Sequence, residues 1–184
     1  MDIIAEAESI EEEVVSFRRE FHQYPEVSGH EVMTTEYIRE HLEKWGISYR
    51  LMEPTGIIGV LGSGSSTTAL RADMDALEIR EGAALSFQSQ NTGCMHACGH
   101  DGHTAVLLAA AKILKEHEDE LDHRIMLVFQ PAEETAQGAA DLLETGILNQ
   151  ADKIFGLHIF SGIEKGKISL EPGARMAATN WFSI

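Results

Sequence analysis

The sequence predicts an α/β fold in which a mostly parallel, mixed sheet is covered by helices on both faces. Runs of β-branched and apolar residues, the pattern of buried strands, occur at 67–73, 124–130 and 153–159. Apolar segments with the length and composition of helices separate these runs, at 104–114 and 135–146. Strands that alternate with helices indicate βαβ units, and such units place their strands parallel in one sheet.

Two amphipathic helices are expected before the first strand. Apolar residues recur at steps of three and four over 10–21, which is the spacing of one buried helix face, and the Tyr-Pro pair at 24–25 ends that helix. A second helix is expected over roughly 29–45. Ser28 is its candidate N-cap, and Gly46 is placed to end it.

Three successive strands are expected at 47–53, 57–62 and 67–73, joined by turns. The glycine-rich stretch 62–66 lacks the Gly-Lys-Ser/Thr ending of a phosphate-binding loop. We therefore interpret it as a hairpin turn.

The charge and cysteine content restrict the classes of partner. The 14 basic and 30 acidic residues give a net charge of −16, which disfavours nucleic acid and anionic membranes as partners. Two cysteines are too few for a disulfide framework, and the chain shows no signal peptide and no apolar run long enough for a membrane span. A cytoplasmic protein is expected.

Polar residues collect at the carboxyl ends of three predicted strands. Asp73 and Asp75 follow one strand, 130–134 follows the next, and His158 ends the third. The cysteine- and histidine-rich loop 94–104 leads into a helix at the same edge. In open α/β sheets ligands bind at this edge, so we expect a binding site there.

Cys98 and His100 are candidate metal ligands. Gly99 between them can adopt backbone angles that let both side chains turn toward one point. Thiolate and imidazole suit Zn²⁺, and Mn²⁺, Ni²⁺ or Co²⁺ become suitable when carboxylates join. These two residues alone are weak evidence, because a histidine in such a loop is more often a surface or capping residue.

Glu133 and Glu134 extend the candidate site. In an extended segment two adjacent side chains point to opposite sides, so one can bind a metal while the other reaches a water on that metal. A water on Zn²⁺ has its pKa lowered to about 7, and a neighbouring carboxylate can take its proton. The alternative interpretation is that both glutamates lie solvated in the first turn of the next helix.

The remaining polar residues have more than one interpretation. His158 is either a core histidine or a ligand, and its place at the binding edge favours a ligand. Asp73 and Asp75 share a face and can bind a metal directly or accept the second ring N–H of a metal-bound histidine. Asp101 and His103 can do the same, or cap the following helix.

Five stretches, in this order along almost the whole chain, resemble the M20 metallopeptidases, and within them the amidohydrolase branch that hydrolyses N-acyl amino acids and auxin conjugates: "FRREFHQYPEVSGHE", "LRADMDALEI", "HACGHDGHTAVLLAAAKIL", "VFQPAEETAQGA" and "FGLHI". The resemblance implies a zinc-peptidase-like catalytic domain with two divalent ions, Zn, Mn, Ni or Co. It implies that the ligands are Cys98, His100, Glu134 and His158, that Glu133 is the general base, and that Asp75 orients a ligand. The implied reaction is hydrolysis of the amide bond of a small N-acyl amino acid or short peptide by metal-bound water.

The resemblance also bears on domain organisation. The wider family often has histidine where this chain has Asp73, whereas the amidohydrolase branch matches it. Members of the family continue past the equivalent of Ile184 into a lid and dimerisation domain, then return with one more histidine ligand. Residues 1–184 are therefore expected to form the amino-terminal, incomplete part of a catalytic domain, the full-length protein being a homodimer. An inactive fragment is the corresponding alternative.

Two interpretations from other classes stay open. One is a non-catalytic domain with a closed structural zinc site built from Cys94, Cys98, His96 or His100. The other is a redox protein, which is disfavoured because Cys94 and Cys98 lie four apart, unlike the two-residue spacer of redox pairs.

Overall fold

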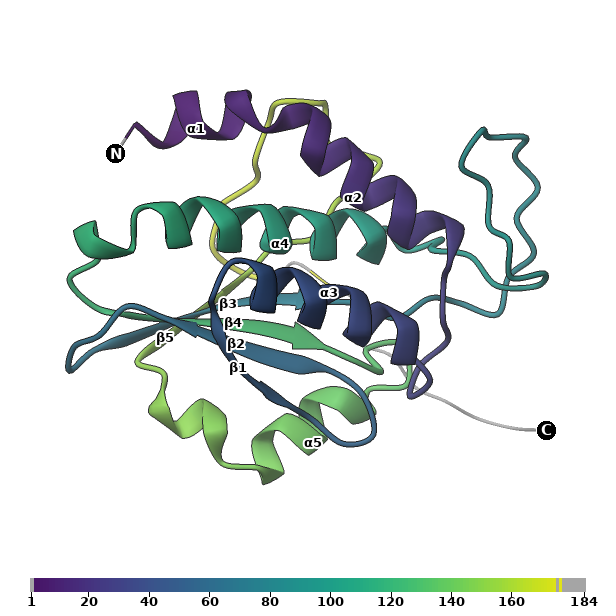
Figure 1. Ribbon diagram of the computed structural model, residues 1–184. Coiled ribbons are helices and arrows are strands. Elements are labelled where there is room, and N and C mark those ends of the chain that lie inside the picture. Colours follow the sequence, from purple (N-terminus) through teal and green to yellow (C-terminus); the bar gives the residue numbers. More distant parts are fainter. Residues whose placement is uncertain (1, 175, 177–184) are drawn as a thin grey trace.

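A mixed five-stranded sheet forms the centre of the computed structural model, which describes residues 2–174 and 176 (Figure 1). The strands, in the spatial order β1-β2-β4-β3-β5, are β1 (Ser48–Leu51), β2 (Ile57–Leu61), β4 (Arg124–Gln130), β3 (Thr67–Asp73) and β5 (Lys153–Gly156). The pairs β1-β2 and β2-β4 are antiparallel, and the pairs β4-β3 and β3-β5 are parallel. The prediction of a mixed α/β sheet is confirmed.

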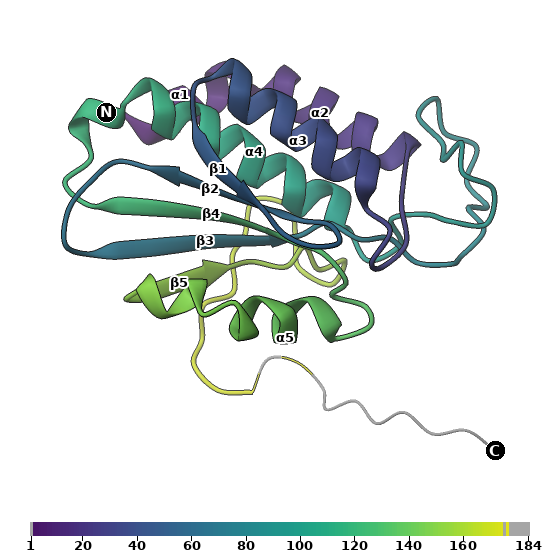
Figure 2. The same cartoon turned by 60° about the horizontal axis from the view of Figure 1, so that its bottom comes forward.

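Helices cover both faces of this sheet, as predicted. The helices are α1 (Ile3–Ser9), α2 (Glu11–Gln23), α3 (Val32–Lys44), α4 (His100–Glu116) and α5 (Gln137–Glu144), with short 3₁₀ turns η1 (Glu118–Glu120) and η2 (Ile147–Gln150). Figures 1 and 2 show α2, α3 and α4 over one face and α5 over the other. In the described part of the chain, no helix has both the length and the hydropathy needed to cross a membrane.

The central strand β4 is buried on both faces. Leu127 and Phe129 pack in the larger core, which includes Ile38 of α3 and Leu108 of α4. Alternate residues such as Val128 pack in a smaller core that α5 closes. This double burial explains why the strand is apolar at successive positions rather than at every second one.

The start of α3 differs from the prediction. The helix begins at Val32, and Ser28 does not cap it, because the Ser28 hydroxyl donates to Asp75 Oδ2 at 2.6 Å. The side chain of Glu31 is fully buried and accepts a hydrogen bond from the backbone N–H of Gly29, which keeps the preceding residues in a turn. The other end is as expected, with Gly46 in the left-handed region at φ +68°.

The glycine-rich connection 62–66 is not a hairpin turn. β2 and β3, which it joins, do not pair with each other, because β4 lies between them and pairs with both. The local turn chemistry was interpreted correctly as a break between strands. The predicted pairing of β2 with β3 was wrong, because β4, which comes much later in the sequence, pairs with both of them.

The last predicted strand is shorter and more exposed than expected. β5 ends at Gly156, and its side chains are solvent-exposed, including Ile154 at 55% and Phe155 at 59%. The apolar composition had predicted a buried strand over 153–159. The strand lies at an edge of the sheet and pairs with β3 alone among the described strands, so neither helical layer covers it.

Candidate metal centre

Side chains from four separate segments meet at the carboxyl ends of the parallel strands. β3, β4 and β5 run in the same direction, and Asp73 at the end of β3 lies beside Gln130 at the end of β4. The amino terminus of α4 reaches the same edge (Figure 1). The expected position of the site, at the ligand-binding edge of an open sheet, agrees with this arrangement.

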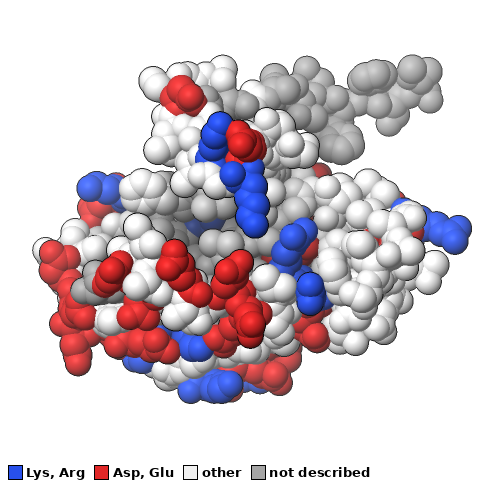
Figure 3. Space-filling model, turned by 90° about the horizontal axis from the view of Figure 1, so that it is seen from above, with Lys and Arg blue, Asp and Glu red and all other residues white. Residues whose placement is uncertain are grey.

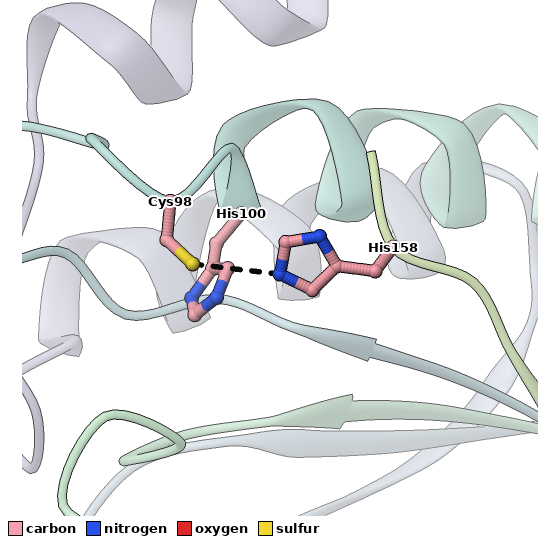
Figure 4. Close-up of side chains that lie close together, drawn as sticks. All are labelled: Cys98, His100 and His158. Atoms are coloured by element: carbon pink, nitrogen blue, oxygen red, sulfur yellow. Dashed lines mark hydrogen bonds between the residues drawn. The ribbon is translucent and has the colours of Figure 1, made fainter. Parts of the chain in front are cut away.

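Cys98, His100 and His158 point toward one another at this edge (Figure 4). Cys98 Sγ lies 3.4 Å from His158 Nε2, and one ligand atom of each residue lies within 4.8 Å of those of the other two. Gly99, with φ +93°, precedes α4 in the left-handed region. This backbone angle, which glycine adopts without strain, lets Cys98 and His100 converge across the start of the helix.

His100 presents one ring nitrogen to the site and holds the other behind it. His100 Nδ1 lies 2.9 Å from the carbonyl oxygen of Asp75 and 3.2 Å from its Oδ1, so Nδ1 carries the proton and donates. Burial alone would lower the pKa of His100, but the hydrogen bond to Asp75 and the neighbouring carboxylates outweigh it and raise the pKa. Nε2 faces the site and offers its lone pair when a cation replaces the proton. A ring nitrogen fixed in this way is the usual state of a metal-binding histidine.

Two buried polar atoms at the centre have no partner within the described residues. These are His100 Nε2 and Glu134 Oε1, which lie 3.8 Å apart. Buried polar atoms are nearly always hydrogen-bonded, so such a pair of lone-pair donors calls for an explanation. Two lone pairs facing each other at this distance fit a shared cation, and the thiol and imidazole nearby have the right chemistry to join it.

Glu133 lies on the open side of the same group. Its Oε2 is 3.9 Å from His100 Nε2, and its side chain is 41% exposed, against 21% for Glu134. Partial burial raises the pKa of Glu133, and the charges of Asp73 and Glu134 add to the rise although His100 opposes it. The two adjacent glutamates thus occupy different environments, one inward and one toward solvent.

Asp75 connects three segments behind the site. It accepts hydrogen bonds from the Ser28 hydroxyl, from the Glu134 backbone N–H at 3.0 Å and from His100. Burial alone would raise the pKa of Asp75, but these hydrogen bonds outweigh it and lower the pKa. Asp75 is therefore a carboxylate that fixes both the His100 ring and the start of the Glu134 turn.

The electrostatics of the site favour a bound cation. Burial and the negative charges of Glu134 and Glu133 raise the pKa of Cys98 to about 12. A thiol in this environment stays protonated until a positive charge offsets the surrounding carboxylates.

Asp101 does not join this group. His103 forms a second cluster with Asp73 and His100, in which one ligand atom of each residue lies within 4.8 Å of those of the other two, but both of its ring nitrogens are already hydrogen-bonded. Asp101 points away, toward His22, whose Nδ1 lies 2.8 Å from Asp101 Oδ2. His103 Nδ1 lies 2.6 Å from Asp73 Oδ1, and His103 Nε2 accepts from the Ile159 backbone N–H at 2.8 Å. Asp73 therefore pairs with His103, whereas Asp75 pairs with His100.

The arrangement gives little support to the structural zinc and redox alternatives. Neither Cys94 nor His96 belongs to any cluster of candidate ligands found in residues 2–174 and 176. His96 is buried, which lowers its pKa to about 4. Cys94 and Cys98 are both free thiols.

Two buried polar networks are not among the features predicted from the sequence. In one, His22 lies between Asp101 and Glu81, and Arg18 also contacts Asp101 at 3.2 Å. In the other, Glu31 accepts from the Thr55 hydroxyl at 2.6 Å and from the backbone N–H of residue 132 at 2.8 Å. One signal was available, since Arg18 and His22 stand four apart on α2 beside the buried aromatic face.

Comparisons with known proteins found relatives over most of the chain. The sequence model of "Peptidase family M20/M25/M40" matches residues 69–181. The chain is 45% identical over 171 residues to the IAA-amino acid hydrolase ILR1-like 4 of Arabidopsis thaliana, covering 92% of this chain and 39% of the relative. It is 43% identical over 179 residues to the N-acetyl-L-cysteine deacetylase of Bacillus subtilis (strain 168), covering 96% and 43%.

A solved structure resembles the fold over most of the chain. A Bacillus subtilis protein described as a dinuclear metal binding peptidase from the M20 family superposes with a TM-score of 0.79 at 41% identity, covering 84% of this chain and 45% of that one. The chain thus spans less than half the length of these relatives. Because the family model covers more than half of the sequence and matches the part that contains the site, the chain belongs to peptidase family M20/M25/M40.

Proposed function

We propose that this chain is part of a metal-dependent hydrolase that cleaves the amide bond of N-acyl amino acids or short peptides. The observation that carries the proposal is the pair of buried, unpartnered atoms His100 Nε2 and Glu134 Oε1 next to Cys98 and His158. The relatives named as an N-acetyl-L-cysteine deacetylase and as an IAA-amino acid hydrolase support the substrate class. Both of those names describe an acyl group joined to an amino acid.

The proposed ligands are Cys98, His100, Glu134 and His158, and together they would hold two divalent cations. A thiolate, two imidazoles and a carboxylate are a donor set that suits Zn²⁺, Mn²⁺, Ni²⁺ or Co²⁺. The structural relative described as dinuclear supports a count of two.

The metal ions, when bound, would polarise the scissile carbonyl. They would also lower the pKa of a water so that it loses a proton and can attack that carbonyl. Glu133 accepts the proton of the attacking water. Its carboxylate lies on the open side of the site, and its Oε2 is 3.9 Å from His100 Nε2, so a water near the metal ions would also be near Glu133. The protonated Glu133 then returns that proton to the amine that leaves. Asp75 keeps the His100 ring oriented throughout, through its hydrogen bonds to Nδ1.

We further propose that residues 1–184 form the amino-terminal part of a catalytic domain. Support comes from the relatives, which are more than twice as long as the matched region. It also comes from β5, an edge strand whose side chains Ile154 and Phe155 remain exposed.

Two free cysteines agree with a cytoplasmic location.

The two adjacent glutamates provide the test of this function. In the full-length protein that contains this chain, Glu133→Gln should remove turnover of N-acyl amino acids by at least about a hundredfold while the metal content stays near normal, because an amide cannot accept the water's proton. Glu134→Ala should instead lose metal together with activity. Metal content is measured by elemental analysis, and turnover on a panel of N-acyl amino acids.

Each variant is the control for the other, because both change the same turn. Retention of most activity in Glu133→Gln would reject Glu133 as the base. Full metal occupancy in Glu134→Ala would reject its role as a ligand.

A further inference from the structure

The segment that contains His158 has little structural support of its own. β5 ends at Gly156, so His158 lies beyond the backbone pairing with β3. The neighbouring side chains Leu157 and Ile159 are 60% and 49% exposed. Something other than the sheet must therefore keep His158 close to Cys98.

The first turn of α4 provides a contact surface for this segment. The side chain of Ile159 lies against Gly102, where a Cβ atom would come within 2.5 Å of Ile159 Cδ1. The His103 ring packs against the His158 ring with centroids 4.6 Å apart and an interplanar angle of 70°. The backbone N–H of Ile159 donates to His103 Nε2 at 2.8 Å.

The hydrogen bonds of His103 fix which of its nitrogens carries the proton. Nε2 accepts from Ile159, so it has no proton, and the proton therefore lies on Nδ1. Nδ1 donates to Asp73 Oδ1 at 2.6 Å. Asp73 is buried and is itself paired with Arg71 Nη1 at 2.7 Å, so it remains available as an acceptor.

We propose that His103 is a positioning residue for the metal centre. Asp73 holds the His103 ring with its proton on Nδ1, and the free Nε2 then binds the Ile159 backbone N–H and places His158 against Cys98 and His100. This inference rests on the proposed function, because it assumes that His158 is a ligand. It assigns the second histidine of the "GHDGH" stretch to the placement of a ligand rather than to metal binding.

Two substitutions of His103 separate this role from a purely structural one. In His103→Gln the amide oxygen can occupy the position of Nε2 and accept from Ile159, while the bond to Asp73 is lost. In His103→Asn the amide N–H can replace Nδ1 and donate to Asp73, while the acceptor for Ile159 is lost. If His103 served only to pair with buried Asp73, the asparagine variant would be the milder of the two.

The readout is Co²⁺ binding to the full-length protein that contains this chain. It is measured by the near-ultraviolet absorption of a cobalt–thiolate bond, which reports Cys98 directly. We expect His103→Asn to weaken the apparent Co²⁺ affinity by about ten- to a hundredfold, the usual effect of removing a partner that orients a ligand. His103→Gln should stay within about threefold of the unsubstituted chain, because it keeps the bond to Ile159. His117→Asn, at a histidine outside the site, controls for the loss of a histidine as such.

The outcomes distinguish the two levels of the proposal. No cobalt–thiolate absorption in the unsubstituted full-length protein would contradict the proposed function, and the inference with it. Normal absorption together with unchanged affinity in His103→Asn, or a larger loss in His103→Gln, would overturn the positioning role alone. Far-ultraviolet circular dichroism confirms that each variant is folded before the titration.

Discussion

Gly102 allows the segment with His158 to lie directly on α4. A Gly102→Ala substitution would place a methyl group within 2.5 Å of Ile159 Cδ1, the end of a flexible side chain. We therefore expect Ile159 to shift and metal affinity to weaken modestly, by about two- to fivefold. The same change should stabilise the helix itself by roughly 0.5–1 kcal/mol, because alanine loses less backbone entropy than glycine. Metal titration and thermal unfolding should therefore move in opposite directions.

The matched control is a second substitution that removes the clashing atom. Ile159→Val lacks Cδ1, so the double variant with Gly102→Ala should recover most of the lost affinity. An unchanged affinity in Gly102→Ala alone would show that the contact with Ile159 does not place His158.

The sequence indicates the residues at the strand ends better than the residues that support them. The proximity of Cys98, His100 and His158 was predictable because His158 follows a predicted strand, and the loop with Cys98 and His100 leads into a helix at the same edge of the sheet. Their role as ligands stays a prediction. The buried carboxylate of Glu31 was not predictable. One of its partners, the N–H of residue 132, lies 101 positions away, and no local pattern marks a residue whose hydrogen bonds form only in the folded chain.

At the scale of elements, one buried histidine joins the long irregular connection between β3 and α4 to two helices. His22 on α2 lies between Asp101 of α4 and Glu81 of this connection, at 2.8 Å and 3.0 Å. Phe87 of the same connection packs edge-on against the His22 ring. The protonated imidazole can donate to both carboxylates at once, which joins three elements.

This arrangement predicts a pH-dependent contribution to stability. Burial alone would lower the pKa of His22, but the hydrogen bonds to Glu81 and Asp101 outweigh it and raise the pKa above the ordinary 6.5. Because the folded-state pKa is the higher one, the stabilisation is fully present below pH 6.5 and is lost as the pH rises through the folded-state pKa. His22→Gln should therefore destabilise the chain more in weak acid than in weak base.

Urea unfolding of the unsubstituted chain and of His22→Gln, at about pH 5.5 and about pH 8.5, measures how the free-energy cost of the substitution depends on pH. We expect the cost of His22→Gln to be larger by about 1–2 kcal/mol at the lower pH, the order of a charge-assisted hydrogen bond. An equal cost at both pH values would show that His22 is not charged in the folded chain.

Strand boundaries were predicted correctly for the two inner strands β3 and β4 and wrongly for the edge strand β5. β4 was expected at 124–130 and occupies Arg124–Gln130, because both of its faces are covered and its sequence is apolar from 125 to 129. β5 has the same composition but lies at the sheet edge, so composition alone overestimated its length and burial. The supposed hairpin at 62–66 failed for a related reason, since strand order depends on distant segments.

The whole molecule combines a strong negative charge with a cluster of carboxylates at one edge of the sheet. Figure 3, viewed from the helical side, shows acidic side chains gathered toward one part of the surface and basic ones dispersed. The net charge is −16. A divalent cation bound at the candidate centre would relieve repulsion there as well as join separate segments, so it should stabilise the fold as a whole.

Thermal unfolding with and without Zn²⁺ tests this expectation. At a free Zn²⁺ concentration of about a hundred times the Kd, the gain is about 2.7 kcal/mol, or a rise in Tm of roughly 5–10 °C for a domain of this size. A chelator should reverse the rise, and Glu134→Ala should reduce it. An equal rise in the Tm of Glu134→Ala would show that Zn²⁺ binds at another site.

The most direct test is crystallography of the full-length protein that contains this chain, with crystals grown in Zn²⁺ and anomalous data collected on both sides of the zinc absorption edge. Convergence of a thiolate, two imidazoles and a carboxylate on shared cations predicts two anomalous peaks about 3.5–4 Å apart, bounded by Cys98, His100, Glu134 and His158. A zinc peak bound instead by Cys94 or His96, or no peak at this edge of the sheet, would contradict it.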